Sequence, residues 1–308
     1  MTVFYEALGS ELEAFWSLVG RGVDAGRGSR LAARRPLAAT GAGDSFAAAL
    51  AWMGVEPRRV RAVDPLDMLA SGFLGACIDA GCVVAGLSVG GVTRSVVEAV
   101  VRFKMLGGRA IAFTSRRLSP LGLACDEVVV LPYSETVMGV GAARHAVMLA
   151  AIASASGGTV KRWDPQPPER GRGLLDYDVY LGVGEASASA LYASLKTCEV
   201  FGECRPWYML EQFIHAPIYT YKPGTRILFF RQSMRDERVE EILQGLRSAG
   251  YIVEEAPAAR GDPWSTVIGQ TYIVLELLKR SAERLGVVKP AYRSHEKLGE
   301  LTELIYYV

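Results

Sequence analysis

The sequence predicts an α/β fold with two lobes, each a parallel sheet flanked by helices in three layers (αβα), related by a pseudo-twofold axis. Apolar runs of strand length alternate with stretches of helical periodicity, the pattern of parallel sheets covered on both faces. A ten-residue phrase occurs twice, at 41–50 (GAGDSFAAAL) and at 182–191 (GVGEASASAL), and the offset of 141 is about half of the 308 residues. Self-similarity at that period indicates two copies of one supersecondary unit.

The first half of the chain is expected to hold an N-terminal helix and one sheet. Apolar residues recur at helical spacing over 3–20, which predicts an amphipathic helix. Short apolar runs that end near Gly, Ser or Pro predict strands at 37–40, 82–87, 109–114 and 127–131. Helices are expected at 93–106 and at 139–156, and the small residues of the latter predict close packing.

The second half repeats this pattern after a segment rich in Pro and Gly. Strands are expected at 177–181, 226–230 and 251–255, and helices at 186–204, 235–249, 265–285 and, in the tail, around 294–304. The expected domains are an N-terminal helix and lead-in at 1–36, a first lobe at 37–160, a linker at 161–175, a second lobe at 176–285 and a C-terminal tail at 286–308.

Composition narrows the classes of function. The formal net charge is +1, so neither nucleic acid nor a membrane surface is expected as a partner. The five cysteines contain no CxxC pair, and with no recognisable leader we expect buried thiols in a cytoplasmic protein. The three histidines have no metal-ligand spacing, so no metal is expected. The chain contains no Asn, a compositional indication of a thermophile.

The strongest candidate for a binding site is the segment Ser88-Val-Gly-Gly-Val-Thr93, where a predicted strand meets a predicted helix. Glycines allow close approach of a ligand, hydroxyls donate to it, and a helix N-terminus favours an anion, so the segment predicts a phosphate site. Ser45 follows the neighbouring predicted strand, and a doubly wound sheet brings such loops to one edge. The alternative is that Thr93 is an ordinary N-cap and the glycines form a tight turn.

The order of several segments resembles the sugar isomerase (SIS) domain. These are Gly41-Ala-Gly-Asp-Ser45, then Ser88 to Thr93, then Thr114-Ser115 with Ser119-Pro-Leu-Gly-Leu-Ala-Cys-Asp126, then Glu135 with Gly139-Val140. The second lobe is similar to the second such domain in the isomerase half of glucosamine-6-phosphate synthase, without its glutaminase domain. There Glu199 is followed after sixteen positions by His215-Ala-Pro217.

The resemblance implies catalytic roles for three residues. Glu199 corresponds to the base that moves a proton between C1 and C2 of the sugar. His215 corresponds to the residue that helps to open the ring and is supplied across a dimer interface, so a homodimer is expected. Lys297 corresponds to the lysine that forms a Schiff base with an open-chain ketose. A carboxylate and an imidazole suffice for aldose–ketose isomerisation, so no metal or organic cofactor is expected.

The resemblance also implies the binding residues for a sugar phosphate. The phosphate is expected at Ser45, Ser88, Gly90, Gly91 and Thr93, and the rest of the sugar at Gly43, Asp44 and Val140. The family commonly has a hydroxyl residue where this chain has Gly90, and small hydroxyl residues near Ala142, so the identity of the sugar stays open.

Glu199 and His215 can also be interpreted as residues with purely structural roles. Glu199 could be a helix residue in a solvated pair with Lys196, and His215 could simply end a helix. The expected function is isomerisation, with deamination as a variant, of a hexose or hexosamine 6-phosphate. One alternative is a phosphoglucose/phosphomannose isomerase, although the phosphate loop of that branch resembles Ser-Tyr-Ser-Gly-Asn-Thr and differs from Ser88-Val-Gly-Gly-Val-Thr93. The other alternative is a non-catalytic protein that binds phosphosugars.

Overall fold

A computed structural model of the chain describes residues 3–33, 36–133, 142–168, 171–293 and 304–307. The chain divides into two compact units. The five-stranded unit comprises Phe15–Val160 with His295–Val308, and the four-stranded unit comprises Met1–Ala14 with Lys161–Ser294. None of the described helices is long and apolar enough to cross a membrane.

The five-stranded unit contains a parallel sheet with the strand order β2-β1-β3-β4-β5. Its strands are β1 Leu37–Gly41, β2 Val60–Ala62, β3 Val83–Leu87, β4 Arg109–Thr114 and β5 Glu127–Val130. The register pairs Gly41 at the end of β1 with Leu87 at the end of β3. The loops that follow these two strands therefore leave the sheet side by side at its carboxyl edge.

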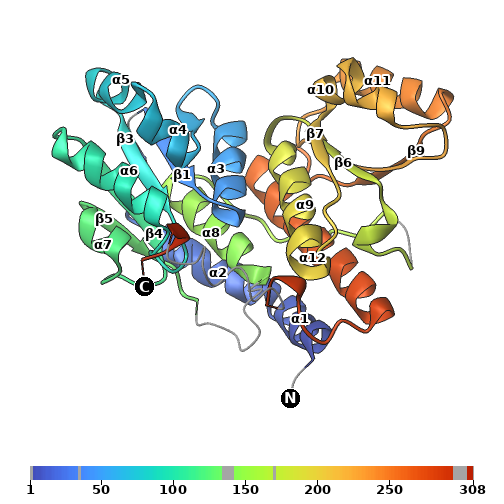
Figure 1. Ribbon diagram of the computed structural model, residues 1–308, viewed down its shortest axis with the longest axis horizontal. Coiled ribbons are helices and arrows are strands. Elements are labelled where there is room, and N and C mark those ends of the chain that lie inside the picture. Colours follow the sequence, from blue (N-terminus) through green and yellow to red (C-terminus); the bar gives the residue numbers. More distant parts are fainter. Residues whose placement is uncertain (1–2, 34–35, 134–141, 169–170, 294–303, 308) are drawn as a thin grey trace. The chain divides into compact units, whose positions relative to one another are not determined.

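Helices cover both faces of this sheet (Figure 1). They are α2 Phe15–Gly26, α3 Asp44–Val55, α4 Pro65–Ala70, α5 Phe73–Asp79, α6 Arg94–Met105, α7 Pro120–Ala124 and α8 Ala142–Ala155. One apolar core joins α4–α7 to alternate strand residues such as Val84 and Ala110. On the other face, Trp52 of α3 meets Phe113 of β4 edge to face, with ring centroids 5.9 Å apart. Apolar residues at both faces explain why the strands read as continuous hydrophobic runs.

Helix α8 packs closely against α2, as its small residues predicted. A Cβ placed on Gly26 of α2 would lie 2.1 Å from the Ala151 carbonyl oxygen, and one on Gly22 would lie 2.6 Å from the Val147 carbonyl oxygen. Only glycine allows the two backbones to approach this far.

The four-stranded unit contains a parallel sheet with the order β7-β6-β8-β9. Its strands are β6 Val179–Gly182, β7 Trp207–Met209, β8 Arg226–Phe230 and β9 Ile252–Ala256. Its helices are α1 Phe4–Glu13, α9 Ser187–Phe201, α10 Leu210–His215, α11 Glu237–Ser248 and α12 Pro263–Leu285, with short 3₁₀ turns η1 Leu174–Asp176, η2 Gly184–Ala186, η3 Pro217–Thr220 and η4 Ala291–Arg293. A core of residues from β6, β8, α10 and α11, including Phe213, Phe229 and Leu243, fills one side of the sheet.

Parallel sheets flanked by helices confirm the predicted α/β class, and the seven predicted strands are present. The single helix predicted over 3–20 is wrong: α1 and α2 are separated at Ala14, α1 packs on α12, and α2 packs on α8. The edge strands β2 and β7 were missed because each has only three residues. The pseudo-twofold axis and the domain boundaries stay predictions.

Candidate functional site

Residues 88–93, predicted from the sequence to bind phosphate and therefore called the phosphate loop, link the end of β3 to the start of α6. Ser88 is buried, and its hydroxyl lies 2.9 Å from the Thr93 hydroxyl and accepts a 3.2 Å hydrogen bond from the Gly91 N–H. Gly90 and Thr93 are partly exposed. The loop is thus a tight turn whose two hydroxyl residues are held against each other.

Gly91 cannot be replaced by a residue with a side chain without displacing its neighbours. Its φ of +69° lies in the left-handed region, and a Cβ there would lie 2.0 Å from the Ser119 Oγ and 2.8 Å from the Thr114 Oγ1. Ser119 itself accepts from Gly122 N–H and caps α7. The glycine is therefore required by packing of the loop against the residues that follow β4.

The loops that follow β3 and β4 are joined through the Val89 carbonyl oxygen. It accepts from the Thr114 hydroxyl at 3.0 Å and from both the N–H and the hydroxyl of Ser115 at 2.8 Å. The sequence marked Thr114 and Ser115 as part of the family resemblance but gave them no role. In the structure they hold the phosphate loop in place.

The N-cap residue of α6 makes no side-chain cap to this helix. Thr93 is the N-cap residue, yet its hydroxyl is directed to Ser88, and the first turn of α6 contains no acidic residue. Its first N–H groups are the positive end of the helix dipole, and no carboxylate within this helix turn offsets them. The arrangement suits an anion.

The loop after β1 lies beside the phosphate loop at the same sheet edge. Gly43 is the N-cap of α3 and has a φ of +55°, and Asp44 and Ser45 form the first turn of that helix. Ser45 is largely buried, and a Cβ on Gly41 would lie 2.8 Å from the Ser45 Cβ. The structure thus brings Gly43, Asp44 and Ser45 to the edge where the doubly wound sheet was expected to place them.

Glu199 lies in the last turns of α9, in the four-stranded unit. Its Oε2 accepts from the Nζ of Lys196 at 2.5 Å. The Lys196 side chain is only 2% exposed, and its ammonium also lies 5.1 Å from the centre of the Tyr192 ring. The pair with Lys196 that was considered from the sequence is therefore present, with a buried ammonium and a Glu199 side chain that is 35% exposed. Lys196 was missed as a candidate because its three-residue spacing from Glu199 is common to many helical ion pairs.

His215 is the last residue of α10 in the same unit, as its purely structural interpretation predicted. Its side chain is 69% exposed, and its Nε2 lies 3.0 Å from an Oε of Glu211, one turn earlier. Glu199 and His215 each have another partner in their own helix. Val140 and Lys297, predicted to bind the sugar and to form a Schiff base, lie outside the described residues.

The counterpart loop, residues 231–236, follows β8 and precedes α11, as the phosphate loop follows β3 and precedes α6. Buried Glu185, from the second copy of the repeated phrase, accepts from the Ser233 N–H at 2.6 Å. Asp236 caps α11 by accepting from Arg238 N–H at 2.8 Å and Val239 N–H at 3.3 Å. Carboxylates of the protein thus bind amides in this loop.

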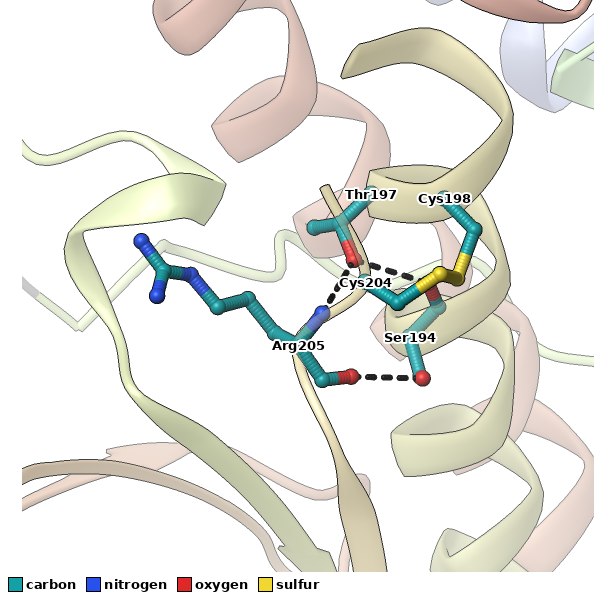
Figure 2. The surroundings of a disulfide bond; sticks show 5 residues. All are labelled: Ser194, Thr197, Cys198, Cys204 and Arg205. Atoms are coloured by element: carbon teal, nitrogen blue, oxygen red, sulfur yellow. Dashed lines mark hydrogen bonds between the residues drawn. A yellow bond between two sulfur atoms is a disulfide. The ribbon is translucent and has the colours of Figure 1, made fainter. Parts of the chain in front are cut away.

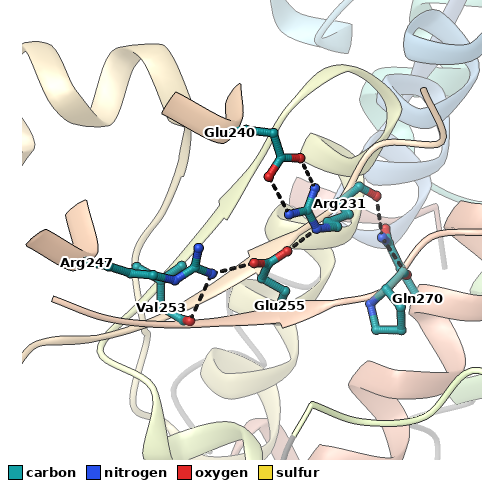
Figure 3. A network of polar contacts seen from close by, with 7 residues as sticks. Arg231, Glu240, Arg247, Val253, Glu255 and Gln270 are labelled. Atoms are coloured by element: carbon teal, nitrogen blue, oxygen red, sulfur yellow. Dashed lines mark hydrogen bonds and ion pairs between the residues drawn. The ribbon is translucent and has the colours of Figure 1, made fainter. Parts of the chain in front are cut away.

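One of the two cations of the counterpart loop, Arg231, is paired with carboxylates of the same unit (Figure 3). The guanidinium of Arg231 binds both oxygens of Glu240, at 2.5 and 2.9 Å, and its Nε donates to Glu255. Arg247 binds the second oxygen of Glu255. The hydrogen bond from Arg231 lowers the pKa of Glu240. No charge in this network needs an external ligand.

The prediction that all cysteines are thiols is wrong. Cys77 is bonded to Cys82 in the five-stranded unit, and Cys198 to Cys204 in the four-stranded unit. Figure 2 shows that Cys198–Cys204 joins the end of α9 to the next segment, where Ser194 and Thr197 bind the backbone of Arg205 at 2.6 and 3.1 Å. Spacings of five and six residues gave no CxxC signal. Cys125 remains a thiol, and burial raises its pKa to about 12.

Comparison with known proteins identifies the fold. No protein-family model matches the sequence, and no curated protein matches it. Among solved structures, glucosamine-6-phosphate deaminase from Thermotoga maritima has a TM-score of 0.68 at 18% identity, over 93% of this chain and 98% of that one.

Two further solved structures extend the comparison. The C-terminal domain of glucosamine-fructose-6-phosphate aminotransferase from Francisella tularensis has a TM-score of 0.65 at 15% identity, over 92% of this chain and 98% of that one. Tagatose-6-phosphate ketose/aldose isomerase from Escherichia coli has a TM-score of 0.60 at 14% identity, over 94% of each chain. The resemblance to sugar isomerase proteins is confirmed for the fold.

Proposed function

We propose that this protein isomerises a phosphosugar, interconverting the aldose and ketose forms of a hexose or hexosamine 6-phosphate, with deamination as a variant. The observation that carries the proposal is the geometry of the phosphate loop. Ser88, Gly91 and Thr93 form a tight turn before α6, whose N-cap residue Thr93 makes no side-chain cap. Ser45, in the first turn of α3, follows the neighbouring strand β1. The counterpart loop is instead occupied by carboxylates of the chain. The N-terminus of α6 is therefore suited to an anion, whereas Asp236 caps that of α11.

In the proposed mechanism Glu199 is the general base. It takes the proton from one of the two carbons C1 and C2 and returns it to the other through an enediol. In the structure Glu199 accepts a hydrogen bond from the buried ammonium of Lys196, which holds its carboxyl group in one position. His215 would assist ring opening, and Lys297 would bind an open-chain ketose as a Schiff base. The neighbours' names, a deaminase and a ketose/aldose isomerase, support this class of reaction.

A turnover assay tests the proposal. Purified protein is given fructose 6-phosphate with and without ammonia, glucosamine 6-phosphate and mannose 6-phosphate. Glu199→Gln keeps the shape of the side chain, and we expect it to lower kcat by at least about a hundredfold, the usual contribution of a general base. Glu203→Gln is the matched control, because Glu203 is exposed and pairs only with Arg205 among the described contacts. Unchanged turnover in Glu199→Gln would reject the base.

A second candidate is a phosphosugar-binding protein without catalysis. It is favoured by one observation: Glu199 is bound by Lys196, and His215 by Glu211. This candidate predicts no turnover of any of the four substrates, together with a higher unfolding temperature in the presence of fructose 6-phosphate. Ser88→Ala should then abolish the stabilisation, while Ser10→Ala in α1 should not.

A further inference from the structure

The C-terminal end of the described chain contacts the phosphate loop. Tyr306 forms an antiparallel bridge with Thr93, and the N–H of Tyr307 donates to the Val92 carbonyl oxygen at 2.8 Å. An isolated β-bridge thus joins residues more than two hundred positions apart in the sequence at the start of α6.

The contact binds one of the carbonyl groups of the phosphate loop, that of Val92. An anion-binding loop presents its N–H groups to the ligand and turns its carbonyl oxygens elsewhere. The Ser88 carbonyl accepts from Gly91 N–H, and the Gly91 carbonyl accepts from Leu121 N–H, each at 3.0 Å. The Val89 carbonyl binds the residues after β4. The Val92 carbonyl takes its hydrogen bond from Tyr307.

The direction of the Val92 carbonyl determines the direction of the next amide. In a trans peptide the C=O of one residue and the N–H of the following residue point in opposite directions. With the Val92 oxygen bound to the tail, the Thr93 N–H points away from the tail. Thr93 is the N-cap of α6, so this amide lies at the positive end of the helix.

The Tyr307 side chain anchors the tail on α6. Its ring centre lies 5.5 Å from the Arg94 guanidinium carbon, and its hydroxyl donates to Glu98 Oε1 at 3.4 Å. Arg94 binds the same carboxylate at 3.0 Å. The ring therefore holds the residue whose N–H binds the loop, and Arg94 is kept in a pair with Glu98 on the outer surface of the helix.

The geometry points to Tyr307 as a positioning residue for phosphate binding: its N–H fixes the Val92–Thr93 peptide, and its ring keeps that N–H in place. Tyr307 acts through the loop rather than by touching the sugar. The inference rests on the proposed function, because it concerns the phosphate of the same ligand. It adds a residue that the sequence alone gave no role.

Two substitutions separate the N–H from the ring. Tyr307→Pro removes both the backbone donor and the aromatic ring, whereas Tyr307→Ala removes only the ring, so the difference between the two variants measures the contribution of the N–H. Tyr219→Ala is the control, since Tyr219 is 85% exposed and lies in the four-stranded unit. Calorimetry gives Kd for inorganic phosphate and for fructose 6-phosphate, and steady-state kinetics give KM and kcat. Unfolding temperatures report any general loss of structure.

We expect Tyr307→Pro to raise both Kd values and KM by about tenfold with kcat unchanged, as loss of one well-aimed hydrogen bond to a charged group would do. Tyr307→Ala should raise them by about threefold, and Tyr219→Ala not at all. Equal Kd values for Tyr307→Pro and wild type would overturn the inference and leave the phosphate site standing. A loss in Tyr307→Ala as large as in Tyr307→Pro would overturn the role of the N–H. Wild-type protein that binds neither ligand would overturn the proposed function as well.

Discussion

The loop after β3 and the loop after β8 occupy the same place in two sheets of similar strand order, and they treat charge in opposite ways. In the phosphate loop, hydroxyls of Ser88 and Thr93 bind each other, and the N-cap residue of α6 makes no side-chain cap. In the counterpart loop, the Ser233 N–H donates to the carboxylate of Glu185, and Asp236 caps α11. Carboxylates of the protein thus bind the amides at the counterpart loop, whereas the phosphate loop is suited to bind the phosphate of a ligand.

The comparison shows how one supersecondary scheme can serve two purposes. Backbone amides at the end of a strand and the start of a helix attract negative charge in either case. When the chain supplies the charge, the loop stabilises the fold. When the loop itself carries only hydroxyl, glycine and valine residues, as 88–93 do, it is suited to recognise an anion from solution. The choice is made by a few side chains rather than by the topology.

The largest expected effect tests the packing that shapes the phosphate loop. Gly91→Ala places a Cβ 2.0 Å from Ser119 Oγ at a left-handed backbone position. We expect it to lower the free energy of unfolding by about 2–4 kcal/mol and to abolish phosphate binding. Chemical denaturation and calorimetry measure the two effects.

Gly90→Ala is the matched control for stability, because its Cβ would meet only Val92 Cγ2, at 3.5 Å. Its free energy of unfolding should stay within about 0.5 kcal/mol of wild type. Equal stability of the two variants would show that the loop does not have the described conformation.

The next effect tests the carboxylate of the counterpart loop. Glu185→Gln keeps the size of the side chain but replaces a charged acceptor of the Ser233 N–H with a neutral one. We expect a loss of about 1–3 kcal/mol in the free energy of unfolding, with the Kd for fructose 6-phosphate unchanged. If Glu185→Gln weakened sugar phosphate binding as strongly as Ser88→Ala, the two loops would not have the separate purposes inferred here.

A comparable effect is expected from the disulfides, one in each unit. Replacing Cys198 and Cys204 together with Ser should cost about 2 kcal/mol, because a closed loop of this length constrains the unfolded chain only modestly. The paired change of Cys77 and Cys82 should cost more, since Cys77 is buried in the apolar core of its unit. Thermal unfolding of both double variants, with and without a reducing agent, measures this order. The reverse order would contradict it.

The smallest effect concerns the ion pairs of the counterpart loop. Because Arg231 lowers the pKa of Glu240, this carboxylate stabilises the fold above the ordinary pKa of Glu, and the contribution is lost as pH falls through the lowered value. Glu240→Gln should cost about 0.5–1 kcal/mol at neutral pH, since the pair is partly solvated. Denaturation at pH 7 and below pH 4 should show the difference shrinking. A constant difference would exclude the pair as its cause.

The sequence predicted the core strands because parallel strands buried on both faces read as apolar runs. It predicted the loops after β1 and β3 because glycines and hydroxyls stand where a strand meets a helix. It could not show the break at Ala14, since the helical periodicity continues across it. It could not show the contact of Glu185 with Ser233 or that of Tyr307 with Val92 either, because both contacts join residues distant in the chain.

A crystal structure with bound fructose 6-phosphate tests the central claim most directly. The account predicts the phosphate at the N-terminus of α6, within hydrogen-bonding distance of the hydroxyls of Ser88 and Thr93, and none at the counterpart loop. A phosphate bound at 231–236, or a fully occupied ligand that avoids the phosphate loop, would contradict it.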